Sequence, residues 1–533
     1  MTLNRNLYIA AALWAVLWAV LAAYLPLFPV DETRYLTVAW EMRNSGDYLL
    51  PTLNFAPYSH KPPMLFWLIN LIWSFSGLSL NAARIIPLCA SMATFVLTIM
   101  LARRMFPNRP RVSTFSGLIF MACPAFMIYG IMIMFDFMQA VFVMMAMIGI
   151  WDAYTTKRFK SWLWVGFSMG LAVLAKGPVV LVHVLPVILL FPLFMRDRWE
   201  GPALKRWFGG LGVAFLIALA MGLAWAVPAA IHGGPKFTHM IFWEQSAGRM
   251  TKSFAHRQPF WFYVPIMMAF ILPLLCWVPF WRSVKQVVAK RRDPAITFLL
   301  CWTVPVFVIF SLISGKQPHY LIPMLPGIAI MIARFVEEQD TGSAKIWGVS
   351  AIIPAIIGFL FFALIQYHPL FSGEDAKYLW QGLQEFNTPM LLVRMAVVIM
   401  FAFGLSATME GQIMAIILSF AILLGSVTIE GQKKLLDYYD LRPMAAELQK
   451  YKDHPIAFAP EYAGEIGFLA RMEKPVIPVG REEAPAWFKK NKGGVMVIRY
   501  KEKSEIKAYK TLYTLPYRGS GFISIVSPKT GAK

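Results

Sequence analysis

Long apolar segments separated by short polar connectors recur along most of the 533-residue chain. The first segment, Leu7 to Phe28, holds no charged residue and is long enough to cross the ~30 Å hydrocarbon core of a bilayer. The pattern predicts about thirteen transmembrane helices, of which this segment is the first. The others lie near residues 83–105, 112–130, 132–151, 161–175, 178–195, 208–231, 260–281, 295–313, 320–336, 345–366, 388–408 and 411–429. We therefore expect a polytopic α-helical membrane protein whose first segment is kept as an uncleaved helix.

Residues 31–81 break this pattern, because their first half is too polar to cross a membrane. Residues 34–49 place apolar side chains at helical spacing, with Arg34, Glu41 and Arg43 on the opposite face, which predicts an amphipathic helix in the membrane interface. The apolar stretch that follows Lys61 and two prolines is too short to span comfortably, so we expect a re-entrant or interfacial segment.

The tail, residues 431–533, has a different composition from the first 430 residues. Helix signals at 441–451 and 461–472 alternate with strand signals, which lie at 454–460, 474–480, 493–500 and 521–527. This alternation predicts a small α/β domain behind a transmembrane domain of residues 1–430. The tail holds no Gly-rich phosphate loop, so we expect a scaffold or a cap that docks the substrate.

Charge sets the expected orientation. Only 15% of residues are charged, against roughly a quarter in soluble proteins. Lys and Arg dominate the formal charge of +21, but they concentrate in alternate connectors, which argues against nucleic acid binding and predicts that these connectors are cytoplasmic. An odd number of crossings with a cytoplasmic N-terminus puts the tail outside the cytoplasm, in a bacterium the periplasm.

Candidate reactive residues gather in the connectors predicted to lie on that outer side. They are Asp31, Glu32, Tyr58, His60, Lys61, Asp136, Lys176, Glu244, Arg249, Lys316, His319 and Tyr320. Some have simpler explanations, since Asp31 would also serve as a helix N-cap, and Lys61 and Lys176 would also extend to lipid headgroups. A carboxylate such as Asp136 inside an apolar helix is costly and is by default a functional candidate.

Together these residue types suit transfer of a group from a lipid phosphate. Lys, Arg and a phenol at headgroup depth can hold a phosphate and stabilise it as it departs. A carboxylate beside the phosphate can accept a proton from an incoming nucleophile or orient it. The four cysteines lie in or beside apolar segments without metal-ligand spacing, so we expect no metal and no other cofactor.

Five short motifs carry a resemblance to a known family. The first apolar segment ends in "DE", and "YSHKPPMLFW" follows; "MFDFMQ", "FWEQSAGRM" and "SGKQPHYLIPMLP" come later in the chain. In this order they resemble the motifs of the GT-C glycosyltransferases, most closely the bacterial lipid A aminoarabinose transferases and, more distantly, the protein O-mannosyltransferases. The similarity extends over about residues 25–330.

The resemblance implies a GT-C fold and an inverting transfer of a sugar from undecaprenyl phosphate to lipid A or another periplasmic acceptor, at the bacterial inner membrane. By matched position, Asp31 would be the leading catalytic carboxylate, and Asp136 would support the site. The carrier phosphate would be held by Tyr58, Lys61, Arg249 and Tyr320. Further candidates for binding the substrate are Glu32, His60, Lys176, Glu244 and Lys316. An acceptor phosphate of lipid A is already ionised near neutral pH, so Asp31 would then mainly orient groups.

Several alternatives stay open. His60 stands where the aminoarabinose transferases usually carry an acid, which leaves a hexosamine, a hexose or a hexuronic acid open as the sugar. The same fold would also serve protein O-glycosylation or glycan-polymer synthesis, whose hydroxyl acceptor needs a true base at Asp31. A lipid flippase or transporter would instead place charges near the bilayer midplane and break helices in paired halves.

Overall fold

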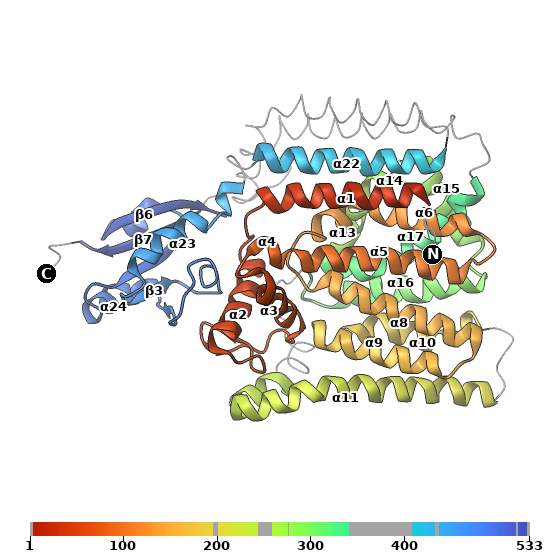
Figure 1. The fold of residues 1–533 in the computed structure, drawn as a ribbon, viewed down its shortest axis with the longest axis horizontal. Coiled ribbons are helices and arrows are strands. Elements are labelled where there is room, and N and C mark those ends of the chain that lie inside the picture. The colour runs from red at the N-terminus through yellow and green to blue at the C-terminus, as the bar shows by residue number, and fades with distance from the viewer. Residues whose placement is uncertain are drawn as a thin grey trace.

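The computed structural model describes residues 4–195, 201–243, 258–275, 277–339, 408–431, 436–518 and 521–529. A bundle of long, roughly parallel helices forms one part, and a small sheet domain lies beyond one end of it (Figure 1). The helices predicted at 345–366 and 388–408 lie outside the described residues.

The bundle contains the helices that the apolar segments predict. They are α1 (Arg5–Tyr24), α5 (Ile85–Met105), α6 (Pro110–Met121), α7 (Pro124–Tyr129), α8 (Asp136–Thr156), α9 (Lys160–Lys176), α10 (Val180–Leu189), α11 (Gly201–His239), α13 (Tyr263–Phe270), α14 (Leu272–Leu275), α15 (Val278–Ala289), α16 (Pro294–Leu312), α17 (Leu325–Gln339) and α22 (Met409–Gly431), with the 3₁₀ turns η1 (Phe191–Leu193), η3 (Phe260–Phe262) and η4 (Pro318–Met324) between them. Within the described ranges, seven helices are long and apolar enough to cross a membrane. A multi-pass membrane protein is thus confirmed, while the number of thirteen crossings stays a prediction.

Two predicted helices are broken in the structure. The segment predicted as one helix at 112–130 divides into α6 and α7, and Pro124 is the first residue of α7. The segment predicted at 260–281 divides among α13, α14 and α15, and each piece carries a proline among its first three residues. Proline fits the first turn of a helix but not its interior, so it starts new helices here.

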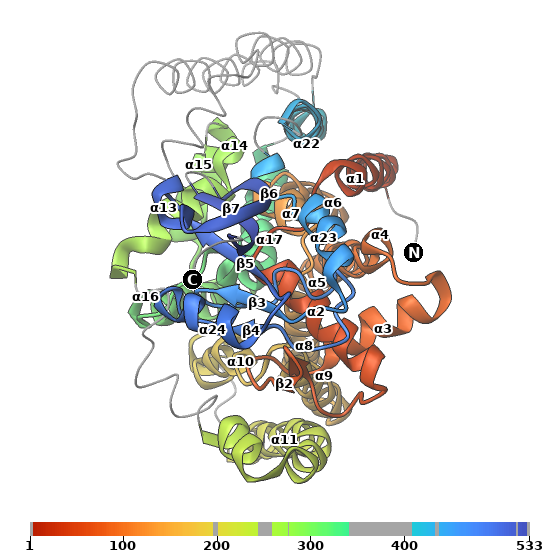
Figure 2. The same ribbon diagram turned by 90° about the vertical axis from the view of Figure 1, so that its left-hand side faces the viewer.

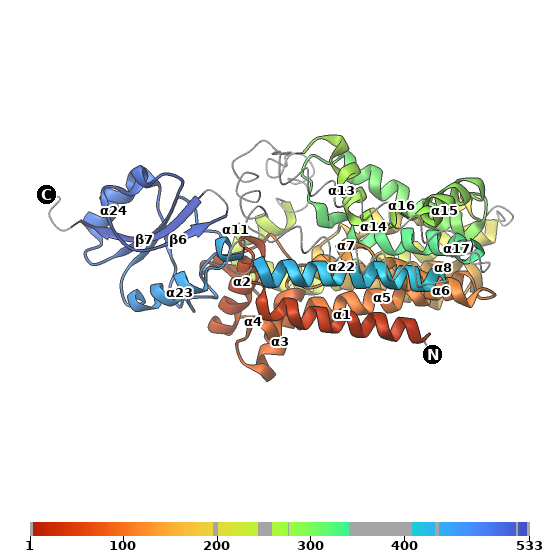
Figure 3. The same ribbon diagram turned by 90° about the horizontal axis from the view of Figure 1, so that it is seen from above.

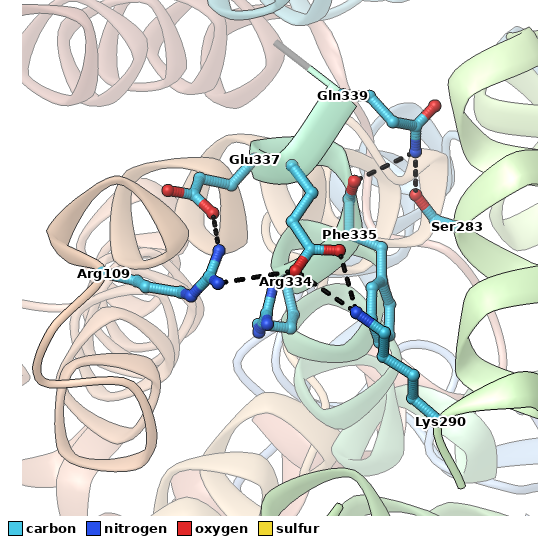
Figure 4. Close-up of polar contacts among 8 residues, drawn as sticks. Arg109, Ser283, Lys290, Arg334, Phe335, Glu337 and Gln339 are labelled. Atoms are coloured by element: carbon cyan, nitrogen blue, oxygen red, sulfur yellow. Dashed lines mark hydrogen bonds and ion pairs between the residues drawn. The ribbon is translucent and has the colours of Figure 1, made fainter. Parts of the chain in front are cut away.

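One end of the bundle carries the basic connectors. Arg104 at the end of α5 pairs with Asp152 near the end of α8, and Arg111 at the start of α6 pairs with Glu410 at the start of α22. Figure 4 shows Arg109, Lys290 and Arg334 turned toward the acidic residues at the end of α17. The connectors predicted to be cytoplasmic therefore meet at one end of the bundle, which we call the basic end.

The opposite end carries short helices between the bundle and the sheet domain (Figure 1). These are α2 (Asp31–Ser45), α3 (Met64–Ser76) and α4 (Leu80–Ala83), with a small hairpin of β1 (Thr52–Leu53) and β2 (Ala56–Pro57). The prediction that α2 has a polar outer face is wrong for Glu41, which is 2% exposed. Its carboxylate accepts hydrogen bonds from the backbone N–H groups of Asn54 and Phe55 at 2.7 and 2.8 Å.

The sheet domain confirms the predicted α/β tail. Its strands are β3 (Ile456–Ala459), β4 (Ile477–Pro478), β5 (Val495–Tyr500), β6 (Tyr509–Tyr517) and β7 (Gly521–Pro528), in the order β4-β3-β5-β7-β6. Strand β3 runs parallel to β4 and β5, while β7 is antiparallel to both of its neighbours. Helix α23 (Arg442–Leu448) packs on one face and α24 (Ala484–Lys490) on the other, because alternate strand residues point to opposite faces. Short 3₁₀ turns complete the domain: η6 (Leu436–Tyr438), η7 (Gln449–Tyr451), η8 (Arg481–Glu483) and η9 (Lys503–Ile506).

The helix predicted at 461–472 is wrong. This segment forms turns and bends, and we call it the 461–472 loop. Gly464 has φ +92°, a conformation that other residues rarely adopt, and a Cβ there would lie 2.9 Å from Cα of Arg34. A Cβ on Gly467 would lie 2.4 Å from Cγ2 of Thr37. The two glycines therefore serve close packing against α2.

Candidate functional site

Asp136 and Lys176 form a buried ion pair at the end of the bundle that faces the sheet domain. Asp136 is the first residue of α8 and Lys176 is the last of α9. Because the two helices are neighbours and run in opposite directions, these positions meet, and the ammonium contacts Oδ1 of the carboxylate. The side chains are only 3% and 8% exposed. The alternative in which Lys176 extends to lipid headgroups is therefore wrong.

The turn η4 adds His319 and Tyr320 to this pair. Nε2 of His319 lies 3.9 Å from Oδ2 of Asp136. The ammonium of Lys176 lies 4.7 Å from the ring centroid of Tyr320, within cation–π range. One carboxylate, one ammonium, an imidazole and a partly buried phenol thus share one cluster.

Asp31 lies at the start of α2 with its side chain 45% exposed. Val30 occupies the N-cap position, so the alternative role of Asp31 as an N-cap is wrong. Nη1 of Arg34 lies 3.8 Å from Oδ1 of Asp31, and the Tyr35 hydroxyl donates to the same oxygen at 3.4 Å. Burial, followed by the charge of Asp31, raises the pKa of Tyr35 well above 10, so the phenol keeps the proton that it donates.

Tyr35 and Phe135 bring the two carboxylates near each other. The Tyr35 hydroxyl donates to Oδ1 of Asp31, and the Tyr35 ring centroid lies 4.8 Å from that of Phe135. The ammonium of Lys61 lies 5.3 Å from the ring centroid of Phe135, the residue before Asp136. The structure therefore brings Asp31, Lys61, Asp136, Lys176 and Tyr320 to one place, from five separate segments of the chain.

Tyr58 and His60 flank this place on the segment before α3. The Tyr58 side chain is buried, and its ring centroid lies 5.2 Å from that of the exposed His60. The Tyr58 ring also lies 6.4 Å from Phe66 of α3, which fixes the segment that carries Lys61. Tyr58 and His60 lie three and one positions before Lys61 in the same short segment.

Two predicted binding residues are instead engaged by the backbone. Glu32 is 1% exposed, and its two oxygens accept from the N–H groups of Phe28 and Ile133 at 3.0 and 2.8 Å. Burial raises the pKa of Glu32 despite the opposing charge of Arg84. Through these two hydrogen bonds, Glu32 joins the α1–α2 connection to the segment before α8. It therefore helps to position Asp31 and Asp136, which follow these segments.

Lys316 is engaged in a similar way. Its ammonium donates to the backbone carbonyls of Gln258 and Ile313, and burial lowers the pKa of the group. These bonds tie the residues before η3 to the end of α16. The other two predicted binding residues, Glu244 and Arg249, lie outside the described residues.

Arg34 and Tyr35 lie at the candidate site without having been predicted there. The helical pattern puts Arg34 on the polar face and Tyr35 on the apolar face of one helix. Their spacing from Asp31, three and four residues, is the signal that was available, because side chains at these spacings are neighbours on a helix. Among the residues that the structure describes, no group of three His, Cys, Asp or Glu side chains lies close enough to hold a metal ion.

Comparisons with known proteins show a family match and a shared fold. Residues 60–225 match the family model described as dolichyl-phosphate-mannose-protein mannosyltransferase. The solved structure of ArnT from Cupriavidus metallidurans bound to undecaprenyl phosphate superposes with a TM-score of 0.79 over 97% of both chains, at 18% sequence identity. The chain has the GT-C fold.

The sequence resemblance to the aminoarabinose transferases is likewise confirmed. The chain is 30% identical over 359 residues to the undecaprenyl phosphate-alpha-4-amino-4-deoxy-L-arabinose arabinosyl transferase of Pseudomonas savastanoi pv. phaseolicola, covering 66% of this chain and 65% of that protein. It is 28% identical over 337 residues to such a transferase, number 1, of Pseudomonas fluorescens, covering 62% and 59%. The aligned part thus spans about three-fifths of the length of these relatives.

Proposed function

We propose that the protein is an inverting glycosyltransferase that moves a sugar from undecaprenyl phosphate to lipid A. The sugar is aminoarabinose or a related one, and the reaction takes place at the periplasmic face of a bacterial inner membrane. The observation that carries this proposal is the convergence of Asp31, Lys61, the Asp136–Lys176 pair and Tyr320 at one end of the bundle. The named activity of the aligned relatives supports it.

In the proposed reaction, the bond between C1 of the sugar and the carrier phosphate oxygen breaks, and its electron pair leaves with the phosphate. An acceptor oxygen forms the new bond to C1 from the opposite face, which inverts the configuration. Lys61, Tyr58 and Tyr320 hold the phosphate and stabilise the negative charge that grows on it, as positioned cations and donors do. Arg249 belongs to the same phosphate-binding set by its matched position.

Asp31 acts at the acceptor. It is the more exposed of the two carboxylates, so it can reach an incoming group, whereas Asp136 is neutralised by Lys176. With a hydroxyl acceptor, Asp31 takes the proton and passes it to water. A phosphate acceptor is already ionised and needs no base. In that case Asp31 helps to orient the acceptor by holding Arg34 and the Tyr35 hydroxyl in place. Asp136 holds Lys176 where the ammonium meets Tyr320.

A second candidate is transfer to a protein hydroxyl. The match of residues 60–225 to the protein mannosyltransferase family model favours it, and this range includes His60, Lys61, Asp136 and Lys176. In that case Asp31 is a true base, and the acceptor is a Ser or Thr side chain.

The test is a transfer assay on the purified protein. Undecaprenyl phosphates carrying aminoarabinose, a hexosamine, a hexose and a hexuronic acid are offered as donors, with lipid A or Ser/Thr-containing peptides as acceptors, and the products are followed by mass spectrometry. We expect transfer to lipid A that is lost in Asp31→Asn and kept in Asp453→Asn, a matched change at an exposed residue of the sheet domain. Transfer to peptides alone would move the assignment to protein glycosylation, and transfer from none of the donors would refute it.

A further inference from the structure

The sheet domain is joined to α2 by hydrogen bonds that lie close to Asp31. Thr37 is 0% exposed, and its hydroxyl donates to the carbonyl of Gly464 at 2.9 Å and accepts from the N–H of Phe468 at 3.0 Å. One turn nearer to Asp31, Nε of Arg34 donates to the carbonyl of Ala463 at 3.2 Å. The three partners, Ala463, Gly464 and Phe468, all belong to the 461–472 loop.

Arg34 connects this loop directly to Asp31. While Nε of Arg34 bonds Ala463, its Nη1 lies 3.8 Å from Oδ1 of Asp31. The same guanidinium therefore faces the sheet domain and the carboxylate at once. Gly464 lets the loop backbone approach the Cα of Arg34, since a Cβ there would lie only 2.9 Å away.

Aromatic packing holds the rest of the loop in place. Phe468 stacks on Trp73 of α3, with ring centroids 5.0 Å apart and an interplanar angle of 5°. The guanidinium of Arg471 lies 3.9 Å from the Phe468 ring centroid, and Trp40 of α2 donates to the carbonyl of Met472 at 2.9 Å. The sheet domain thus shares a packed core with α2 and α3 and is not a freely tethered cap.

We propose that the 461–472 loop holds Asp31 in its reactive orientation through Arg34 and Thr37, which are positioning residues for the transfer. The inference rests on the proposed function, and it assigns the sheet domain a part in the chemical step. Fixing α2 from the sheet domain fixes the first turn of the helix, where Asp31 lies. Small displacements of a reacting group lower the rate of a chemical step steeply.

The test compares Thr37→Val with Thr37→Ser. Valine keeps the shape but removes both hydrogen bonds, so we expect kcat to fall about tenfold, while the Kd for undecaprenyl phosphate stays within about twofold because Tyr58, Lys61 and Tyr320 are untouched. Thr37→Ser keeps both bonds and should transfer at the wild-type rate. Thr511→Val, the same change at an exposed residue of β6, is the matched control and should change neither quantity.

A fully active Thr37→Val protein would overturn the proposal. So would equal losses of transfer and of undecaprenyl phosphate binding, since these would mark a general loss of structure. If Thr37→Val fails to fold, Arg34→Gln replaces it as the test, because the Arg34 side chain is 25% exposed and its truncation spares the core. The expected result is again a lower kcat with an unchanged Kd for undecaprenyl phosphate. A wild-type protein that transfers no sugar would refute both the proposed function and this inference. If the wild type is active and Thr37→Val is equally active, only the inference is refuted.

Discussion

The buried Asp136–Lys176 pair favours a functional role for this end of the bundle over a stabilising one. Removing two charges from water costs free energy that their mutual attraction only partly offsets, so a buried ion pair is weak evidence of stabilisation. Here the pair also lies at the end of two apolar helices, where charged residues usually serve function. Its location beside Tyr320 and His319 is consistent with that role.

Breaking this pair should separate its structural and functional roles. Lys176→Met leaves the Asp136 carboxylate buried without its partner, so we expect a loss of about 3–5 kcal/mol in the free energy of unfolding, measured by denaturation in detergent. The double variant Asp136→Leu, Lys176→Met removes both charges and should regain most of that stability while staying inactive. A stable Lys176→Met protein would contradict the burial that the structure gives the pair.

At this scale, the sequence predicted which residue types lie at the site but not how they pair. Acids and cations at helix ends mark Asp31, Asp136 and Lys176 as candidates. That Lys176 reaches Asp136, and that Glu32 and Lys316 bond the backbone instead, depends on which helix ends are neighbours. Spacing along the chain does not specify this for residues forty or a hundred positions apart.

Among the elements, α2 and the connection that follows it hold several parts of the molecule together. Asp47, after the end of α2, accepts from the N–H groups of Leu49 and Leu50 at 2.9 and 3.1 Å. Its Oδ2 lies 2.9 Å from Nε2 of His232 on α11. Trp225 of α11 donates to the carbonyl of Leu49 at 3.0 Å. Helix α11, which lies along the edge of the bundle in Figures 1 and 2, is thereby fastened to the site end.

This attachment should weaken in acid. Burial alone would raise the pKa of Asp47, but the two backbone N–H groups and His232 outweigh it and hold the pKa below 3.8. A depressed carboxyl pKa contributes stability that is present above the unfolded-state value and is lost as the pH falls through the folded-state value. We therefore expect wild type to unfold at a higher temperature than Asp47→Asn at pH 6, and the difference to disappear as the pH is lowered below 3.8. A difference that persists unchanged in acid would show that the charge of Asp47 does not contribute.

Helices and strands were predicted well where features of the local sequence determine them. Apolar length gave the positions of α5, α9 and α16, and alternation with Gly and Pro gave β3, β5 and β7. The 461–472 loop was mistaken for a helix because its composition suits one. What prevents the helix is contact with α2, since Gly464 and Gly467 take the close approaches to Arg34 and Thr37, and no local signal carries that information.

In the part of the chain that the structure describes, charged residues cluster at the two ends of the bundle. The basic end joins Arg109, Arg111 and Lys290 to acids of α17 and α22, and the other end holds the candidate site and the sheet domain (Figure 3). By the excess of Lys and Arg in its connectors, the basic end is predicted to face the cytoplasm. The site would then face the periplasm, where lipid-linked sugars take the place of nucleotide donors.

Cysteine labelling tests this orientation. The four natural cysteines are replaced by alanine, and a single cysteine is introduced at Ser504 of the sheet domain or at Arg158 of the basic end, both exposed positions. In spheroplasts, we expect a membrane-impermeant maleimide to label Ser504→Cys at once and Arg158→Cys only after the membrane is opened. The reverse pattern would place the site in the cytoplasm and remove the basis for a periplasmic acceptor.

At the scale of the whole chain, the membrane class, the fold and the separate tail were all predictable from apolar length, motif order and composition. The docking of the tail on α2 was not, because it depends on single contacts such as those of Thr37 and Phe468. The two Thr37 hydrogen bonds join residues more than four hundred positions apart.

The most direct test of the central claim is single-turnover transfer by Asp31→Asn, with undecaprenyl phosphate binding measured on the same sample. In the proposed reaction, Asp31 acts on the acceptor and Lys61 on the carrier phosphate. Asp31→Asn should therefore bind undecaprenyl phosphate as wild type does and transfer sugar to lipid A at least a hundredfold more slowly, in the ~10²–10⁴ range typical of a lost general acid–base group. For a phosphate acceptor, the same lower bound applies to lost orientation. Lys61→Met should instead lose binding. Transfer by Asp31→Asn at the wild-type rate would contradict the assignment of the reaction to this end of the molecule.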